Sequence, residues 1–386
     1  MLRYLNRNLM YLFLINIAFG LSSQMINPLL PLFLDSIGAK EAEIAYIVSA
    51  GSLAATLLML PSGIIIDRVG RKIFLLLNAG ISAFSIFMMS KSSDWRIVFP
   101  FYVLFSLVGA FFVPARMSMI SENATMESRA ALFGVMNMAW PITGIISPVL
   151  SGWIVEKAGW SIVYIIATIV SGLSLLPALL IHENKVDHRE KQNRPKLAEL
   201  LKEDSLRVLV VMSVAPFLMT TAIGAVNLVM PLYLSDAYKL SPSMIGLFFT
   251  ASNVFTLLTQ IPSGRLADRF DPKRILLSLT TVIPIFFVIW HFSDQWLILL
   301  VAYSLSVGLW TMTWPSNLTT ISREIPREFQ GAGYGINATG LRMGFTVGPL
   351  VASYMYGNMF STSPFLFAAA SSILALPVIS LLKKRN

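Results

Sequence analysis

The stretch PSGIIIDRVGRK, from Pro61 to Lys72, returns 201 residues later as PSGRLADRFDPK, from Pro262 to Lys273. Both copies keep the opening Pro-Ser-Gly, an Asp-Arg pair and the closing lysine, and both lie between long apolar runs. A charged turn that recurs between apolar segments indicates a duplicated membrane bundle. The repeat therefore predicts two related halves.

Other parts of the chain repeat at nearly the same offset. The matches are Tyr102 with Tyr303, Pro114 with Pro315, Pro148 with Pro349, and NPLLPLFL at 27–34 with NLVMPLYL at 227–234. Each match alone carries little information. A shared offset across separate regions is what a duplication produces.

Composition places the chain in a membrane. Of its 386 residues, 55% are hydrophobic and 13% are charged, whereas soluble domains carry about 25% charged residues. The apolar runs reach roughly 20 residues, enough to cross a bilayer as helices, and none alternates with period two. We therefore expect an all-α membrane protein with twelve transmembrane helices.

The basic residues predict the orientation. Of the 29 Lys and Arg residues, 22 fall on one side of the predicted spans, five on the other and two inside spans. Cytoplasmic loops of membrane proteins are rich in Lys and Arg, so both termini are expected in the cytoplasm of a cell-membrane protein. The same rule accounts for the net charge of +9 without a nucleic-acid partner.

The longest charged stretch predicts the domain boundaries. Residues 1–181 are expected to form one six-helix bundle, 182–207 a cytoplasmic linker, and 208–386 the second bundle. Lys196–Glu203 within the linker has the pattern of a short amphipathic helix on the membrane surface.

The repeated turn has the spacing G-x-x-x-D-R-x-G-R-K. In the first copy these residues are Gly63, Asp67, Arg68, Gly70, Arg71 and Lys72. The motif closely resembles the loop signature of the major facilitator superfamily, and the resemblance covers essentially the whole chain. It implies two pseudo-symmetric six-helix bundles, transport rather than catalysis, no cofactor or metal, and a monomer.

The resemblance also implies a gate at this turn. The gating residues it implies are Gly63, Asp67, Arg68, Gly70, Arg71, Arg129, Asp268 and Arg269. In the family the acid of the motif contacts the start of span eleven, near Gln330 here, and holds the outward-facing state. Asp67 is expected in that role with Arg129 as its ion-pair partner, and Gly63 is expected to allow close helix packing. The alternative is a plain positively charged turn.

Spans five and eleven contain small residues before a proline, at 147–152 and 348–353. Such segments give kinked, tightly packed helices. They resemble a Gly/Pro segment of the family's antiporters, although in span five only Pro148 and Gly152 fit it strictly. The pattern leaves proton antiport open.

Polar side chains share helix faces in spans one, four, seven and ten, which line the central cavity in this family. The expected substrate-binding residues, including neighbours in spans five and eleven, are Arg342, Arg116, Asn27, Gln24, Asn16, Tyr102, Trp140, Asn227, Tyr303, Trp310, Trp314 and Asn317. Polar groups do not face lipid without cost, so these stripes face protein or water. Hydrogen bonding between helices is the alternative role for any single Asn.

Two of these residues are arginines inside predicted spans. Arg342 lies about 18 Å from the start of span eleven at 1.5 Å per residue, and a charge at that depth marks a functional candidate. Arg116 lies about 9 Å from one end of span four, so its side chain either contacts a solute or extends to the membrane surface. No Asp or Glu falls within the middle of a span. This distribution favours a solute with a negative or strongly accepting group.

The expected function is secondary transport of a small organic solute, anionic or amphipathic, by alternating access. The expected partners are that small-molecule substrate and the membrane lipids. Broad drug efflux by proton antiport is one alternative, and a lipid flippase or scramblase on the same scaffold is another. The chain has no Cys, which excludes thiolate catalysis, and it lacks the phosphate-binding loop motif of ATP-driven pumps.

Overall fold

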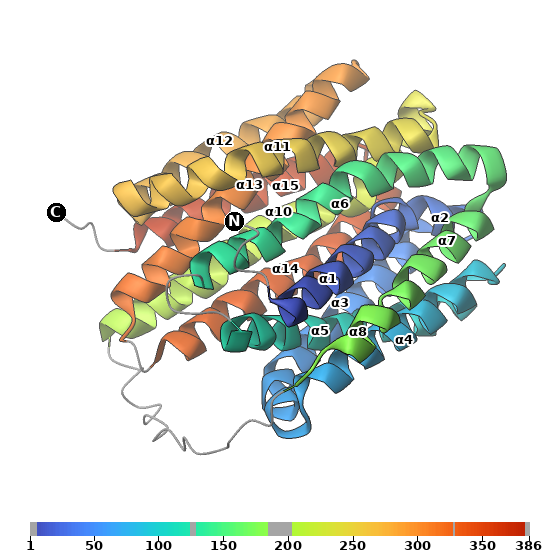
Figure 1. Ribbon diagram of the computed structural model, residues 1–386. Coiled ribbons are helices and arrows are strands. Elements are labelled where there is room, and N and C mark those ends of the chain that lie inside the picture. Colours follow the sequence, from blue (N-terminus) through green and yellow to red (C-terminus); the bar gives the residue numbers. More distant parts are fainter. Residues whose placement is uncertain (1–5, 124–128, 184–202, 327–328, 383–386) are drawn as a thin grey trace. The chain divides into compact units, whose positions relative to one another are not determined.

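The computed structural model describes residues 6–123, 129–183, 203–326 and 329–382, which are helical apart from short connections (Figure 1). The elements are α1 Arg7–Ile26, η2 Asn27–Leu29, α2 Leu30–Ser36, α3 Glu41–Val69, α4 Arg71–Ser90, α5 Trp95–Asn123, α6 Arg129–Ala158, α7 Trp160–Leu173, α8 Leu175–Leu180, α10 Glu203–Tyr238, α11 Pro242–Arg269, α12 Pro272–Phe292, α13 Trp296–Glu324, α14 Gln330–Asn358 and α15 Ser363–Ser380.

Eleven segments of the described chain are long and apolar enough to cross a membrane. The first combines α1, η2 and α2, and the sixth combines α7 and α8. The 29-residue α14 falls outside this group, since it is rich in Gly and contains Arg342. With α14 counted, the described chain has the expected twelve long helical segments. The all-α, multi-pass fold is confirmed.

A proline lies just after the break in each of the two interrupted spans. A proline lacks a backbone N–H and its ring collides with the carbonyl four residues earlier. For Pro31 that carbonyl belongs to Asn27, where α1 gives way to η2. For Pro177 it belongs to Leu173, the last residue of α7. Other prolines, such as Pro148 inside α6, leave their helix unbroken, so a proline permits these breaks without deciding them.

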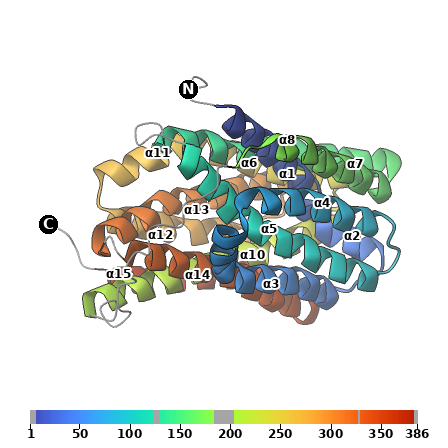
Figure 2. The same cartoon turned by 60° about the horizontal axis from the view of Figure 1, so that its bottom comes forward.

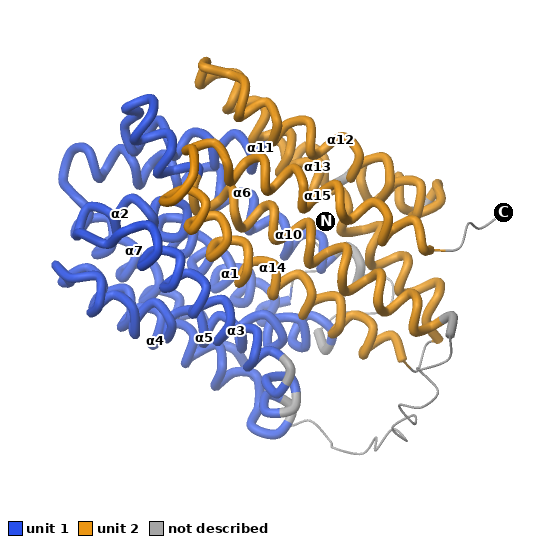
Figure 3. The backbone as a smooth tube through the Cα atoms, turned by 180° about the vertical axis from the view of Figure 1, so that it is seen from behind, with its two compact units in different colours: residues 1–184, 230–254 blue, residues 185–229, 255–386 orange. Residues whose placement is uncertain are grey.

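The chain divides into two compact units (Figure 3). Unit 1 contains residues 1–184 and 230–254, and unit 2 contains 185–229 and 255–386. The later part of α10 and the first part of α11 thus group with unit 1. The predicted division at 181 and 208 stays a prediction, and the surface helix expected at Lys196–Glu203 lies almost wholly outside the described residues.

Both units contain the same packing arrangement. In unit 1, α4 lies against α5 and α7 (Figure 2), and α1 lies against α6 and α7. In unit 2, α12 lies against α13 and α15 in the way that α4 lies against α5 and α7. Buried apolar side chains such as Leu12, Phe112 and Met136 form a core of unit 1. The duplication seen in sequence thus extends to helix packing.

Candidate functional site

The first copy of the repeated turn joins α3 to α4 through Gly70, which has a φ of 104°. L-residues rarely adopt this conformation, and a Cβ here would also lie 3.0 Å from the Glu183 carboxylate. Glu183 accepts backbone N–H bonds from Arg71 at 2.5 Å and from Lys72 at 3.2 Å. A carboxylate at this position complements the positive end of the helix dipole. Glu183 is therefore the anion that caps α4.

Two basic side chains tie this turn to the rest of unit 1. Arg71 is buried, its Nε donates to Ser118 Oγ of α5 at 3.1 Å, and its guanidinium lies 4.0 Å from Glu183. Lys72 Nζ donates to the carbonyl oxygen of Leu179 at 2.7 Å. The motif residues thus hold three helices and the segment after α8 together. Glu183 was missed by the sequence reasoning because it lies 112 residues from Arg71.

The second copy of the turn uses a local cap. Asp271, at the position of Gly70, accepts the backbone N–H of Lys273 at 3.1 Å. Lys273 Nζ donates to the carbonyl of Ser380 at 2.7 Å and also to that of Leu382. Ser380 lies 201 residues after Leu179, so the lysine bond of the first copy is repeated. Both copies of the turn thus have the same lysine bond to the last span of their unit, but the capping carboxylate comes from a different residue in each.

The remaining gating candidates are less defined. Arg68 and Arg269 are exposed. A Cβ placed on Gly63 meets no atom of another described element within 4 Å, and the close packing expected at this glycine stays a prediction. The side chains of Asp67, Arg129 and Asp268 lie outside the described part of the structure. A gating role for this set stays a prediction.

Arg116 of α5 points into unit 1. Its guanidinium donates to Asn16 Oδ1 at 3.0 Å and to Asn137 Oδ1 at 3.3 Å, while Asn16 Nδ2 donates to the carbonyl of Met136 at 2.6 Å. Asn16 lies about 14 Å into its span at 1.5 Å per residue. Arg116 is therefore bonded inside the bundle and does not extend to the membrane surface. Asn137 was missed because the sequence reasoning sought polar faces on four other spans.

A tyrosine–asparagine pair occurs once in each unit. Tyr102 donates its hydroxyl to Asn27 Oδ1 at 3.4 Å in unit 1. Tyr303 donates to Asn227 Oδ1 at 2.9 Å in unit 2. The residues correspond at offsets of 201 and 200. Both pairs were expected as cavity residues, and the structure brings the members of each together.

The predicted tryptophans differ in burial. Trp310 is buried and meets the rings of Trp314 and Phe345 edge-on, with centroid distances of 5.3 and 6.0 Å. Trp314 and Trp140 are each 47% exposed. Two of the three indoles are thus nearly half exposed.

Gln24 and Arg342 are the other two predicted binding residues. Gln24 is buried within α1. Arg342 is partly buried on α14, and its backbone carbonyl accepts the hydroxyl of Thr346 at 3.2 Å. Their binding roles stay predictions.

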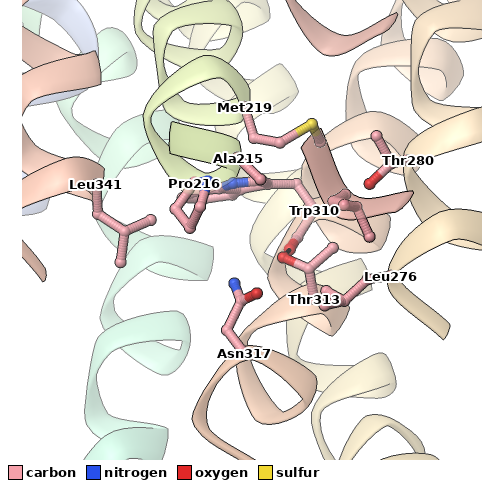
Figure 4. A pocket seen from close by; sticks show the side chains of 10 residues that line it. Ala215, Pro216, Met219, Leu276, Thr280, Trp310, Thr313, Asn317 and Leu341 are labelled. Carbon is pink, nitrogen blue, oxygen red and sulfur yellow. Dashed lines mark hydrogen bonds between the residues drawn. The ribbon is translucent and has the colours of Figure 1, made fainter. Parts of the chain in front are cut away.

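Trp310 and Asn317 line a pocket inside unit 2 (Figure 4). The other lining residues are Ala215, Pro216, Met219, Leu276, Thr280, Thr313, Leu341 and Ile379. They come from α10, α12, α13, α14 and α15. The pocket is narrow and has room for about one water-sized group.

Small residues of α6 allow close contact with α11 inside unit 1. A Cβ on Gly152 would collide with the backbone of Pro242, and one on Gly246 would collide with the backbone of Pro148. Close to this contact, Glu156 accepts the backbone N–H of Ser243 at 2.8 Å. The tight packing expected around Pro148 and Gly152 is thus observed.

Two compact units of membrane-length helices that repeat the same packing and the same side-chain bonds define a duplicated helical transporter. The model of the Major Facilitator Superfamily matches residues 12–223 and 212–386, and the chain belongs to this family. Its members are transporters, so the expected fold, transport as the general function and the absence of an enzymatic role are confirmed.

The chain resembles named relatives along nearly its whole length. It is 22% identical over 380 residues to the quinolone resistance protein NorA of Staphylococcus aureus (strain COL), covering 97% of this chain and 95% of the relative. It is 23% identical over 396 residues to an uncharacterized MFS-type transporter of Methanocaldococcus jannaschii, covering 98% of both.

A solved structure shares the fold. The crystal structure of a bacterial homolog of the human lysosomal transporter Spinster, inward-facing and occupied, matches with a TM-score of 0.77 at 12% sequence identity. The match covers 97% of this chain and 95% of the other. At 12% identity this similarity is evidence for a shared fold and for nothing more.

Proposed function

We propose that this protein moves a small organic solute, anionic or amphipathic, across the cell membrane by alternating access. The observation that carries the proposal is the tyrosine–asparagine bond present once in each unit, Tyr102 with Asn27 and Tyr303 with Asn227. Because each bond lies within one unit, each unit can move as a body without breaking it. The transporter acts as a monomer with both termini in the cytoplasm.

The Pro61–Lys72 turn serves as a gate in this proposal. Glu183 and Ser118 hold Arg71 against unit 1, so the turn is a fixed platform. The gating role proposed for Asp67 is to hold the outward-facing state, as the acid of this motif does in the family. A gate needs one part that stays fixed and one contact that forms and breaks. The bonds around Arg71 keep the turn fixed.

The test is transport by purified protein in liposomes. The probes are 3-phenylpropionate, 2-phenylethylamine and 2-phenylethanol, which share one body and carry an anionic, a cationic and a neutral end. We expect uptake of at least one probe. Asp67→Asn should lower uptake about tenfold while leaving probe binding intact, and Asp294→Asn, an exposed acid after α12, should not.

Two results would contradict the proposal. Uptake of none of the probes by the wild-type protein would argue against a small organic solute of this kind. Unchanged uptake with Asp67→Asn would argue against the gate while leaving transport in place.

Proton-coupled drug efflux is the second candidate, favoured by the similarity to NorA along nearly the whole chain. Under this candidate the protein exports a quinolone in exchange for protons. Collapsing the proton gradient in loaded vesicles should then stop export. Export that continues without the gradient would exclude proton antiport.

A further inference from the structure

The pocket in unit 2 differs chemically from the same place in unit 1. At the 201-residue offset, Thr280 corresponds to Ala79 and Thr313 corresponds to Phe112. Both residues of unit 1 are buried and apolar. Two hydroxyl groups therefore line the pocket where unit 1 has a hydrocarbon core.

The Thr280 hydroxyl is one of the polar groups buried without a partner in the described structure. Thr280 is 1% exposed, and no hydrogen-bond partner for its Oγ1 occurs among the residues that the structure describes. A buried polar group without a partner destabilises a fold. Since Ala79 fills the same position in unit 1, the fold does not need a hydroxyl there. The hydroxyl is explained if its partner enters through the pocket.

The polar groups of the pocket can both accept and donate hydrogen bonds. The Thr313 hydroxyl donates its hydrogen to the carbonyl of Trp310 at 2.7 Å, so its lone pairs remain available. Figure 4 shows the Asn317 amide and the Thr280 hydroxyl turned toward the space between the lining side chains. No charged residue lines the pocket, and the Trp310 ring forms part of its wall. Hydroxyl and amide groups beside an aromatic ring, around a space for about one water-sized group, suit an end group of one heavy atom such as an amine or a hydroxyl, whereas a carboxylate is larger.

Unit 1 shows how the repeat accommodates such a donor. Arg116 corresponds to Asn317 at the same offset. The Arg116 guanidinium donates to the side-chain oxygens of Asn16 and Asn137. Unit 1 thus carries its own donor, the Arg116 guanidinium, at this position. Unit 2 has the shorter Asn317 side chain and a pocket there.

We propose that the pocket is a recognition subsite for the hydrogen-bond-donating end group, a primary amine or a hydroxyl, of an amphipathic solute. Only this end group enters, because the pocket holds about one water-sized group. The inference rests on the proposed transport of such a solute and names the part of it that unit 2 recognises. Thr280 is the hydroxyl that the end group satisfies.

The experiment measures binding of the three phenyl probes to purified full-length protein in detergent. Thr280→Val replaces the hydroxyl by a methyl group of equal size. It should weaken binding of 2-phenylethylamine and 2-phenylethanol about tenfold and leave 3-phenylpropionate within about twofold. Thr280→Ser should restore binding of both donors.

Thr281→Val is the matched control. Thr281 is the next residue on α12, is exposed, and donates to the carbonyl of Leu277 within its own helix. It should bind all three probes like the wild type. A loss of donor binding equal to that of Thr280→Val would overturn the subsite, because the effect would then belong to the helix and not to the pocket.

The remaining outcomes are also decisive. Equal binding of both donors by the wild type and Thr280→Val, or no binding of either donor by the wild type, overturns the subsite. Liposome uptake of a probe with no effect of Thr280→Val keeps the proposed function and rejects the subsite. Donor binding that depends on Thr280 without any uptake keeps the subsite and rejects transport of these probes.

Discussion

The two copies of the repeated turn solve one electrostatic problem in different ways. Both α4 and α12 begin with a carboxylate at their positive end. Asp271 supplies it from the turn itself, whereas Glu183 supplies it from the segment after α8. The comparison teaches that each unit has a carboxylate at this helix start, but that the carboxylate can come from different parts of the chain. Unit 1 thereby has a second link between its turn and the end of its last span, in addition to the Lys72 bond that both units share.

A second difference lies deeper in the units. At one repeat position unit 1 has Arg116, bonded to two asparagines, and unit 2 has Asn317, which lines a pocket. The lysine bonds to a carbonyl and the tyrosine–asparagine pairs are common to both. The side-chain chemistry of the two units thus differs at this interior position, while these bonds are the same in both.

The largest expected effect tests the interior difference. Arg116→Leu leaves the side-chain oxygens of Asn16 and Asn137 without their donor, which should cost about 2 to 4 kcal/mol of stability. Asn317→Leu should change stability by less than about 1 kcal/mol, because its side chain faces a pocket. The measurement is the thermal unfolding midpoint of both variants in one detergent. Equal losses would show that the two positions have not diverged.

The next effect tests the source of the capping anion. Glu183→Ala removes two backbone bonds and the neighbour of the Arg71 guanidinium, and should cost about 1 to 3 kcal/mol. Asp271→Ala removes one capping bond and should cost about 0.5 to 2 kcal/mol. Thermal unfolding again reports the difference. A larger loss for Asp271→Ala would reverse the comparison and make the local cap the more important one.

The smallest effect tests the shared pairs. Tyr303→Phe removes a 2.9 Å bond to Asn227 and should cost about 0.5 to 1.5 kcal/mol. Tyr102→Phe removes a 3.4 Å bond to Asn27 and should cost less than about 0.5 kcal/mol, since hydrogen bonds weaken with length. A combined variant should show the sum, because the pairs lie in separate units. A greater loss from Tyr102→Phe would mean that the longer bond is the stronger.

The sequence was sufficient for the fold because the deciding signals are local or regularly spaced. Apolar run length predicts the crossings, and the fixed offset predicts that Tyr102 and Tyr303 occupy like places. The inward direction of the Arg116 side chain could not be predicted in this way. It depends on the position of Asn137 on α6, which no spacing rule supplies. Helix periodicity shows which residues share a face but not which helix that face meets.

Two features of the candidate sites could not be predicted from the sequence, each for a physical reason. Glu183 meets Arg71 across 112 residues, and its role depends on where α8 ends relative to α4. Thr280 sits in an apolar helix where a hydroxyl usually bonds its own backbone. Only the packed unit shows that its Oγ1 lacks such a bond in the described structure and lines a pocket.

The distant cap on α4 has a consequence for biosynthesis. A membrane protein is made from its N-terminus, so the start of α12 meets its carboxylate as soon as Asp271 leaves the ribosome. The start of α4 waits until Glu183 has been translated, more than a hundred residues later. During that interval the first turn is incomplete, and the nascent chain completes it only when its sixth crossing arrives.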